Sequence, residues 1–302
     1  MDDCLRIIRV PASTSNLGPG FDSLGLALQL YLTVEVRRLD SGPSRLEFFG
    51  EDTHLIPTDE SNLVWHVMSE LAIDRGVTLP AFSLRISNEI PITKGLGSSA
   101  TACLAGLAAA SFLCRLDLKD RDMLEIASRR EGHPDNVAPA LYGGLVSSIG
   151  GAEILCSRSD FPGSWTIVAV TPAFELETKR ARAVLPARIP FADAVFNIQR
   201  SAFLMAQIVQ GRKEGVREAM TDRLHHPYRV KLLPGLEEIL NMADCEGLVG
   251  VALSGAGSTV IAFADSHAKE IGESIRGIFA KHGLGSTVRL LKADNRGMVM
   301  EN

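Results

Sequence analysis

Alternating hydrophobic and polar positions predict strands in the first half of the chain, and apolar positions repeated every three or four residues predict helices between them. Leu63, Val67 and Leu71, for example, line one face of a predicted helix. The predicted strands cover 5–10, 26–37, 82–90 and 143–151, and the predicted helices cover 62–75, 98–114 and 121–130. The segment 131–139, EGHPDNVAP, is flanked by proline and is expected to form a loop.

The second half continues with the same mixture of strands and helices. Strands are expected at 165–170 and 287–291, helices at 177–185, 191–211 and 266–282, and a strand, glycine turn and second strand at 247–265 after one more helix. Strands and helices do not alternate regularly in either half, which favours an α+β fold over a doubly wound sheet. Turn-forming residues cluster at 157–164, SRSDFPGS, so we expect one domain over residues 1–160 and another over residues 161–302.

The composition is that of a folded protein with small-molecule partners. Of the 302 residues, 46% are hydrophobic and 22% are charged, which argues against a disordered chain. The net charge of −5 gives no general attraction to nucleic acid or to an anionic membrane surface. Any anionic ligand must therefore be held by a local site.

Cysteine usage and the apolar segments favour a cytoplasmic protein. The cysteines are odd in number, with no CxxC pair and no metal-ligand spacing, so reduced, buried thiols are expected. They are Cys4, Cys103, Cys114, Cys156 and Cys245. The first ten residues, MDDCLRIIRV, lack the basic and apolar regions of a secretory signal. The apolar segment 100–114 is shorter than the roughly 18 residues that span a membrane and is rich in alanine, which favours a buried helix.

The segment 91–101, PITKGLGSSAT, places two glycines directly before this apolar helix. Gly95 and Gly97 permit backbone conformations closed to other residues, and Ser98 and Ser99 fall in the first helical turn. Free amide N–H groups and the positive end of the helix dipole point outward there, which predicts an anion site. A simple helix cap at Ser98 is the alternative, although a cap does not require two glycines.

Two familiar phosphate motifs do not account for this segment. The pattern GxxxxGK[ST] occurs nowhere in the sequence, which excludes a Walker-type loop. Gly95, Gly97 and Ala100 match the dinucleotide pattern GxGxxG/A, and Asp117 follows about 20 residues on. Asp117 lies between two predicted helices rather than at the end of a strand, so an NAD enzyme is disfavoured.

Four segments together resemble the GHMP family of small-molecule kinases. They are PASTSNLGPGFDSLGLAL (11–28), PITKGLGSSAT (91–101), EGHPDNVAPALYGG (131–144) and LSGAGSTVIAF (253–263). The resemblance implies an N-terminal α+β domain with the nucleotide loop, a C-terminal ferredoxin-like domain and an active site between them. The first and third segments resemble the branch of the family that phosphorylates L-homoserine to O-phospho-L-homoserine for threonine synthesis.

The resemblance also implies where ATP and Mg²⁺ bind. The residues that would contact ATP are Pro91, Ile92, Thr93, Lys94, Gly95, Leu96, Gly97, Ser98, Ser99, Ala100, Thr101 and Asn62. Mg²⁺ prefers oxygen ligands and would be held by Ser99 and Glu131. Asn62 has a second interpretation as a helix cap, and Glu131 has one as a solvated helix end. Lys94 stands where many family members have another residue, and it either contacts phosphate or is solvated.

The same resemblance implies the groups that bind the amino-acid acceptor. Carboxylates are best bound by the guanidinium fork, and the matching positions are Arg182 and Arg229, with Thr178 nearby. The ammonium and hydroxyl end would be bound by Asn16, Asp22, His133 and Asn136. By default each arginine would be a solvated charge and His133 a structural histidine. The resemblance leaves a homodimer open.

Asn136 stands where several relatives have an aspartate that acts as a base. An amide cannot accept a proton, so positioning and charge stabilisation would carry catalysis, as a loose phosphoryl-transfer transition state permits. Asp135 is the alternative base, but adjacent loop residues usually point in different directions, so we expect only one of the two to face the substrate.

Two other functions are compatible with the sequence. One is a GHMP kinase for mevalonate, shikimate or a sugar, although mevalonate has no amine for Asp22. The other is a catalytically silent binding protein with the same fold. Such a protein is expected to have lost Ser99, Glu131 or a loop glycine, and the sequence retains all of them.

Overall fold

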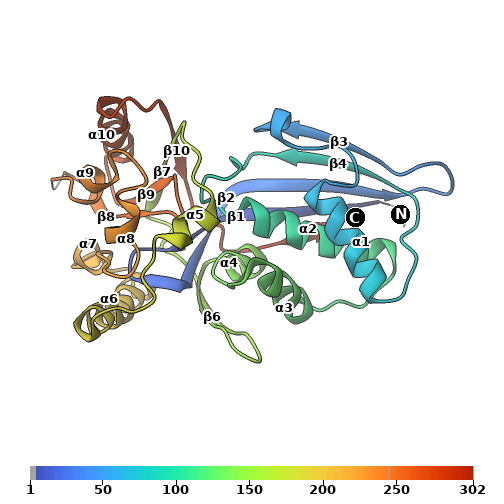
Figure 1. The fold of residues 1–302 in the computed structure, drawn as a ribbon, viewed down its shortest axis with the longest axis horizontal. Helices are drawn as coiled ribbons and strands as arrows, with labels where there is room; N and C mark the ends of the chain where they lie inside the picture. The colour runs from blue at the N-terminus through green and yellow to red at the C-terminus, as the bar shows by residue number, and fades with distance from the viewer. Residues whose placement is uncertain (1–4, 244, 302) are drawn as a thin grey trace.

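The computed structural model describes residues 5–243 and 245–301, which form two α+β halves lying side by side (Figure 1). The strands are β1 (Leu5–Asn16), β2 (Gly20–Arg38), β3 (Arg45–Gly50), β4 (Phe82–Asn88), β5 (Leu145–Ile149), β6 (Leu155–Ser159), β7 (Thr166–Pro172), β8 (Leu248–Leu253), β9 (Val260–Ala264), β10 (Ser286–Leu291) and β11 (Val299–Glu301). The helices are η1 (Thr53–Leu55), α1 (Leu63–Asp74), α2 (Ser98–Leu113), α3 (Asp120–Glu131), α4 (Val137–Tyr142), α5 (Thr178–Ala183), α6 (Phe191–Val209), α7 (Val216–Ala219), α8 (His226–Arg229), α9 (Leu236–Leu240) and α10 (Ala268–Lys281).

The N-terminal half is built on a sheet with the order β11-β1-β2-β4-β3, and β5 and β6 extend it from β2. The pairs are antiparallel except for β3 and β4. Helix α2 packs against β1 and lies between α1 and α3. Of its 16 residues 12 are buried, which explains the mostly apolar sequence. The predicted buried helix is therefore confirmed, and no helix of the described chain is long and apolar enough to span a membrane.

The C-terminal half is built on an antiparallel four-stranded sheet with the order β10-β7-β9-β8. In chain order its strands and its long helices, α6 and α10, give a β-α-β-β-α-β unit, which is the ferredoxin-like arrangement. Ile271, Ile275 and Phe279 of α10 are buried in the core beside this sheet. The expected α+β class is confirmed in both halves.

The β1–β2 turn and strand β11 are among the segments that connect the halves. The turn between β1 and β2 reaches the C-terminal half, where its residues contact α6 and the segment before α8 (Figure 1). Strand β11 returns to the N-terminal sheet, where Glu301 pairs with Ile7. The division of the chain at residue 160 stays a prediction.

Several elements differ from the sequence-based expectation. Strands β3, β6 and β11 were not expected, and the single helix predicted before residue 247 is instead three short helices, α7, α8 and α9. Helix α4 occupies part of the predicted loop 131–139. Pro139 is in the first turn of α4, where a missing N–H costs no helical hydrogen bond, so a proline there does not indicate a loop.

The described thiols agree with the expectation of reduced cysteines, but the expectation that they are buried is wrong for Cys114 and Cys156, which are half-buried. Cys103, Cys114 and Cys156 are free, and burial raises the pKa of the Cys103 thiol to about 12. Cys4 lies outside the described residues. Cys103 is therefore an inert core residue of α2.

Candidate active site

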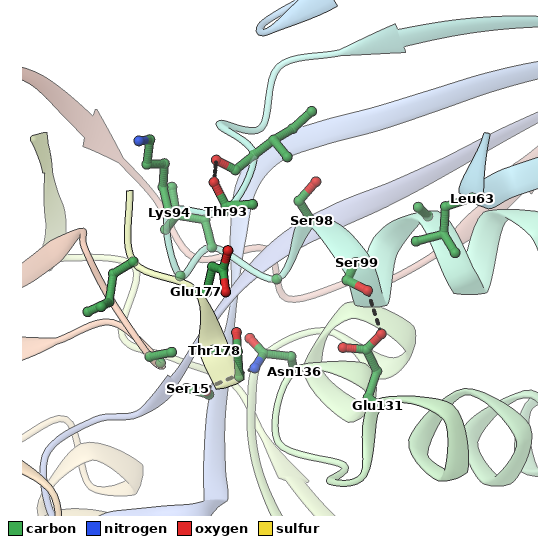
Figure 2. Close-up of a pocket in the computed structure, with 18 of the residues that line it drawn as sticks. Ser15, Leu63, Thr93, Lys94, Ser98, Ser99, Glu131, Asn136, Glu177 and Thr178 are labelled. Carbon is green, nitrogen blue, oxygen red and sulfur yellow. Dashed lines mark hydrogen bonds between the residues drawn. The ribbon is translucent and has the colours of Figure 1, made fainter. Parts of the chain in front are cut away.

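A cavity of about 660 Å³ lies between the two halves, and most of the predicted site residues line it (Figure 2). Those that line it are Asn16, Asp22, Asn62, Ile92, Thr93, Lys94, Gly95, Leu96, Gly97, Ser98, Ser99, Glu131, His133, Asn136, Thr178, Arg182 and Arg229. Pro91, Ala100 and Thr101 do not line it. Ala100 and Thr101 are buried in the first turn of α2, where Thr101 Oγ1 donates to the Ser98 carbonyl.

The glycine segment ends in a helix N-terminus that no side chain caps. Gly97 is the N-cap residue of α2, with φ of 71°, and Ser98 is the first helical residue. The alternative that Ser98 merely caps the helix is therefore wrong. The first intrahelical bond runs from Thr101 N to Gly97 O, so the amides before it point out of the helix end. This end can bind an anion.

The glycine segment is held from both halves of the molecule. Ser13 N donates to Leu96 O at 3.1 Å, and Thr259 N donates to Lys94 O at 3.0 Å. A Cβ added at Gly97 would overlap Ser13 Oγ, so only glycine fits there at this φ. The backbone of the loop is thereby fixed before any ligand binds.

Lys94 is neither solvated nor directed at the loop amides. Its Nζ donates to the Phe174 carbonyl at 3.0 Å, and Ser258 Oγ donates to the same oxygen at 2.6 Å. Figure 2 shows its side chain leaving the loop on the side away from Ser99. Lys94 therefore ties the glycine segment to the chain that precedes α5.

Ser99 and Glu131 meet across the N-terminus of α2. Ser99 Oγ donates to Glu131 Oε1 at 2.6 Å, as the dashed line in Figure 2 marks. Glu131 is the last residue of α3, and Gly132 follows it in a left-handed conformation. The pair offers a hydroxyl and a carboxylate oxygen, a donor set that suits Mg²⁺.

Asn62 is a helix cap in this structure. Its side chain accepts from Val64 N at 3.0 Å and donates to Pro57 O at 3.0 Å. Both ends of the amide are thus occupied, although the residue also lines the cavity. Contact with an adenine ring stays a prediction.

Asn136 and Asp135 both line the cavity, so the expectation that only one would face it is wrong. Asn136 precedes α4 with helical φ and ψ, and its Nδ2 lies 3.4 Å from Asp135 Oδ1, so the backbone does not separate the two side chains. Ser13 Oγ donates to Asn136 Oδ1 at 3.0 Å, and Asn136 Nδ2 donates to Ser15 Oγ at 3.0 Å. Two serines of β1 thereby fix the orientation of the amide.

The Asp135 carboxylate is buried and contacts His133 Nδ1. Burial lowers the pKa of His133. The hydrogen bond to Asp135 and the charge of that carboxylate together raise it by more, so the pKa lies above its ordinary value. His133 and Asp135 therefore form a hydrogen-bonded pair beside Asn136.

Asp22 and Arg182 form a two-point ion pair. Arg182 Nη1 and Nη2 donate to the two carboxylate oxygens at 3.0 and 2.6 Å. Asp22 also lies near His133 and Asp135, and one ligand atom from each of these three residues falls within 4.8 Å of the others. The two carboxylates make this corner suitable for a cationic group.

Arg229 is buried, with 1% of its surface exposed, although it lines the cavity. Nη1 donates to Gly255 O at 2.8 Å and contacts His225 Nδ1 at 3.2 Å, while Nε donates to Ala181 O at 3.2 Å. Burial and the charge of Arg182 lower the pKa of Arg229 to about 10. Three of its five N–H groups are therefore occupied, whereas those of Nη2 have no hydrogen-bond partner among the described residues.

The sequence analysis did not predict the residues whose hydrogen bonds orient the side chains of this site. Ser13, Ser15 and Gly255 bond to the predicted residues, and His225 contacts Arg229. The signal for the first three was present, because they lie inside the segments 11–28 and 253–263. His225 stands in HHPYR, but two adjacent histidines do not indicate which one faces the arginine.

Two family models match the chain: GHMP kinases N terminal domain over residues 62–144, and GHMP kinases C terminal over residues 204–281. A homoserine kinase from Desulfitobacterium hafniense is 42% identical over 292 residues, which cover 96% of this chain and 98% of that protein. A homoserine kinase from Deinococcus radiodurans is 41% identical over 298 residues, which cover 98% of this chain and 96% of that protein.

Solved structures show the same likeness. The crystal structure of homoserine kinase from Cytophaga hutchinsonii superposes with a TM-score of 0.86 at 27% identity and covers 100% of this chain and 98% of that one. The structure of L. major mevalonate kinase in complex with R-mevalonate gives a TM-score of 0.73 over 94% of each chain. At 16% identity, that second likeness concerns the fold alone.

Proposed function

The chain belongs to the GHMP kinases, and we propose that it transfers the γ-phosphoryl group of ATP to the hydroxyl of L-homoserine, forming O-phospho-L-homoserine. The relatives with about 40% identity over nearly the whole chain are homoserine kinases. The observation that carries the proposal is the placement of an uncapped helix N-terminus and the Asp22–Arg182 pair in one cavity. The helix N-terminus suits phosphate, and the Asp22–Arg182 pair suits an amino-acid zwitterion.

ATP would place its phosphates at the N-terminus of α2. The outward-pointing amides and the helix dipole favour negative charge there. Ser99 and Glu131 would hold Mg²⁺, which neutralises phosphate charge when bound. Ser99 Oγ and Glu131 Oε1 already meet in the structure, so both oxygens would be close enough to bind one ion once it replaced their mutual hydrogen bond.

Homoserine would bind with its charged ends between Asp22, Arg182 and Arg229. The ammonium group would bind to the carboxylates of Asp22 and Asp135. The substrate carboxylate would accept a hydrogen bond from Nη2 of Arg229. Arg182 uses both of its Nη groups on Asp22, so the pair has to open, at least in part, if Arg182 is also to bind the substrate. An ion pair whose side chains are 36% and 35% exposed opens at little cost.

The proposed chemistry needs no strong base. Asn136 cannot accept a proton, and Asp135 is engaged by His133. Asn136 would orient the substrate hydroxyl, while the helix N-terminus stabilises charge on the transferred group. Positioning of this kind is sufficient for a loose phosphoryl-transfer transition state.

An ADP-release assay with L-homoserine, mevalonate, shikimate and galactose as separate acceptors tests the proposal, with the product identified by phosphorus NMR. We expect turnover with homoserine to exceed that with each other acceptor by at least about a hundredfold in kcat/KM. Comparable or greater turnover with another acceptor would make the chain a different GHMP kinase. ATP binding without turnover on any of the four would favour a silent binding protein.

A further inference from the structure

A closed ring of hydrogen bonds lies behind the proposed substrate site. Arg229 Nη1 donates to Gly255 O, and Asn16 Nδ2 donates to the same oxygen at 3.0 Å. On the other side, Arg229 Nη1 contacts His225 Nδ1, and His225 Nε2 contacts Gly18 O at 2.8 Å. Gly18 follows Asn16 by two residues, so the ring closes through the β1–β2 turn.

The donors and acceptors of this ring leave His225 one protonation state. A guanidinium has only N–H donors, so His225 Nδ1 must accept. A carbonyl only accepts, so Nε2 must carry the proton. The neutral Nε2–H tautomer satisfies both contacts, whereas an imidazolium would place two donors against each other at Arg229. Burial and the charges of His226 and Arg229 lower the pKa of His225 to about 3, although the Asp222 carboxylate, 3.7 Å from Nε2, acts in the opposite direction.

The ring decides which part of Arg229 is available to a ligand. Nη1 has two N–H groups, and Gly255 and His225 use both. Nε has one, and Ala181 O accepts it. In the part of the chain that the structure describes, no hydrogen bond uses Nη2. The guanidinium therefore offers a single nitrogen rather than a two-nitrogen fork.

We propose that His225 is a positioning residue, which as its neutral Nε2–H tautomer holds Arg229 so that Nη2 faces the substrate carboxylate. His225 itself is fully buried and does not line the cavity, so it acts through Arg229 and through Gly18. The role of Arg229 Nη2 in binding the substrate carboxylate rests on the proposed function. The tautomer of His225 does not depend on it.

The β1–β2 turn is held independently of His225, which makes a substitution there interpretable. Asn197 Nδ2 donates to Pro19 O at 3.0 Å, and Ser201 Oγ donates to the same oxygen at 2.9 Å. Loss of the Gly18 contact alone thus leaves the turn attached to α6. The two contacts of His225 can then be separated by two variants.

His225→Gln places an amide nitrogen near the Nε2 position and removes the acceptor for Arg229, while His225→Asn places a carbonyl oxygen near the Nδ1 position and keeps that acceptor. We expect His225→Gln to raise the homoserine KM about tenfold, as loss of one bond to a charged group does, with the ATP KM changed by less than about twofold. His225→Asn should raise the homoserine KM by less than about threefold. Equal effects of the two variants would overturn the proposal.

His226→Gln is the matched control. His226 is adjacent, buried and packed against the ring of His225, but its Nε2 accepts from Leu253 N at 3.3 Å, and no hydrogen bond within the described chain joins it to Arg229. This variant should lose thermal stability like His225→Gln while keeping the homoserine KM within about twofold. A rise in KM as large as that of His225→Gln would show that both histidines act only on the fold.

Nitrogen NMR of the wild-type imidazoles tests the ring without any substitution or substrate. Between about pH 5.5 and 8, His225 should show a protonated Nε2 and an unprotonated Nδ1, with no titration. An Nδ1–H tautomer or a protonation step in that range would overturn the proposal even if the variants did not fold. Failure of the wild-type enzyme to phosphorylate homoserine would instead contradict the proposed function and leave this result unaffected.

Discussion

Arg182 and Asp22 lie 160 residues apart in the sequence and meet through two hydrogen bonds in the cavity between the halves. The two charges are complementary to those of an amino-acid zwitterion: Asp22 suits an ammonium group, and Arg182 suits a carboxylate. In the structure, Asp22 and Arg182 therefore neutralise each other with the same groups that homoserine would use.

Removing either charge of this pair should weaken homoserine binding selectively. We expect Asp22→Asn and Arg182→Gln each to raise the homoserine KM by about ten- to a hundredfold, because a charge-assisted bond contributes about 1.5–3 kcal/mol, with the ATP KM changed far less. Steady-state kinetics measures both constants. Arg223→Gln is the control, since Arg223 forms an ion pair with Asp193 and does not line the cavity. Equal changes in both constants would show that the pair supports the fold instead.

Gly97→Val should abolish high-affinity nucleotide binding. The new Cβ would overlap Ser13 Oγ at a left-handed φ, which displaces the loop amides. We expect the ATP Kd to rise by more than about tenfold in calorimetric titration, as loss of one phosphate contact predicts. Gly76→Val is the control, because Gly76 has a similar φ of 64° and its Cβ would meet no atom within 4 Å. Unchanged affinity in a folded Gly97 variant would contradict the phosphate site.

Glu131→Gln should remove the metal site with little loss of fold. The amide keeps the size of the side chain but not its charge, so kcat/KM at fixed magnesium should fall by about a hundredfold or more. A titration of activity with magnesium measures the effect. Glu125→Gln, on the same helix and in an exposed pair with Arg121, should have normal activity. Near wild-type turnover of the Glu131 variant at saturating magnesium would leave Glu131 as an ordinary helix end.

Arg229→Ala should damage both substrate binding and stability. The sequence alone predicts a selective effect on the homoserine KM, of about ten- to a hundredfold. The structure adds the loss of three hydrogen bonds to Ala181, Gly255 and His225, which together contribute about 3 kcal/mol. Urea unfolding and steady-state kinetics measure the two effects. A homoserine analogue without the carboxylate should lose little further affinity on this substitution, and an equal loss for both ligands would contradict the assignment.

Acid should destabilise the protein through its buried histidines. Burial lowers the pKa of His225 to about 3 and that of His226 to about 4, so the unfolded chain binds protons that the folded chain does not. Their contribution to stability is therefore complete above about pH 6.5 and is lost as the pH falls from there toward about 4. Each histidine should decrease the free energy of unfolding by about 1.4 kcal/mol per pH unit in that window.

Urea unfolding of the wild type and of His226→Gln at several pH values tests this prediction. The stability difference between the two proteins should narrow as the pH falls, because the variant has one fewer buried imidazole. His133 acts in the opposite direction, since its raised pKa gives a contribution that is lost as the pH rises. A difference that stays constant between about pH 7 and 5 would show that His226 is not held neutral.

Local sequence patterns predicted the parts of the site that one segment makes by itself. Gly97 before Ser98 indicated a helix end suited to phosphate, and the structure has that uncapped end. Pairings over long sequence distances were not predictable, because the residues around Asp22 and Arg182 do not indicate that these two side chains meet. Arg229 was correctly placed beside the cavity, but its sequence cannot reveal that backbone carbonyls and His225 occupy most of its fork.

The pairing of β11 with β1 has a consequence for biosynthesis. Strand β1 leaves the ribosome before every other described strand, whereas β11 follows them all. The edge of β1 that Val299–Glu301 covers therefore stays unpaired until the C-terminal half has been synthesised. During translation the nascent N-terminal sheet therefore carries an open edge, the kind of surface through which incompletely folded chains aggregate.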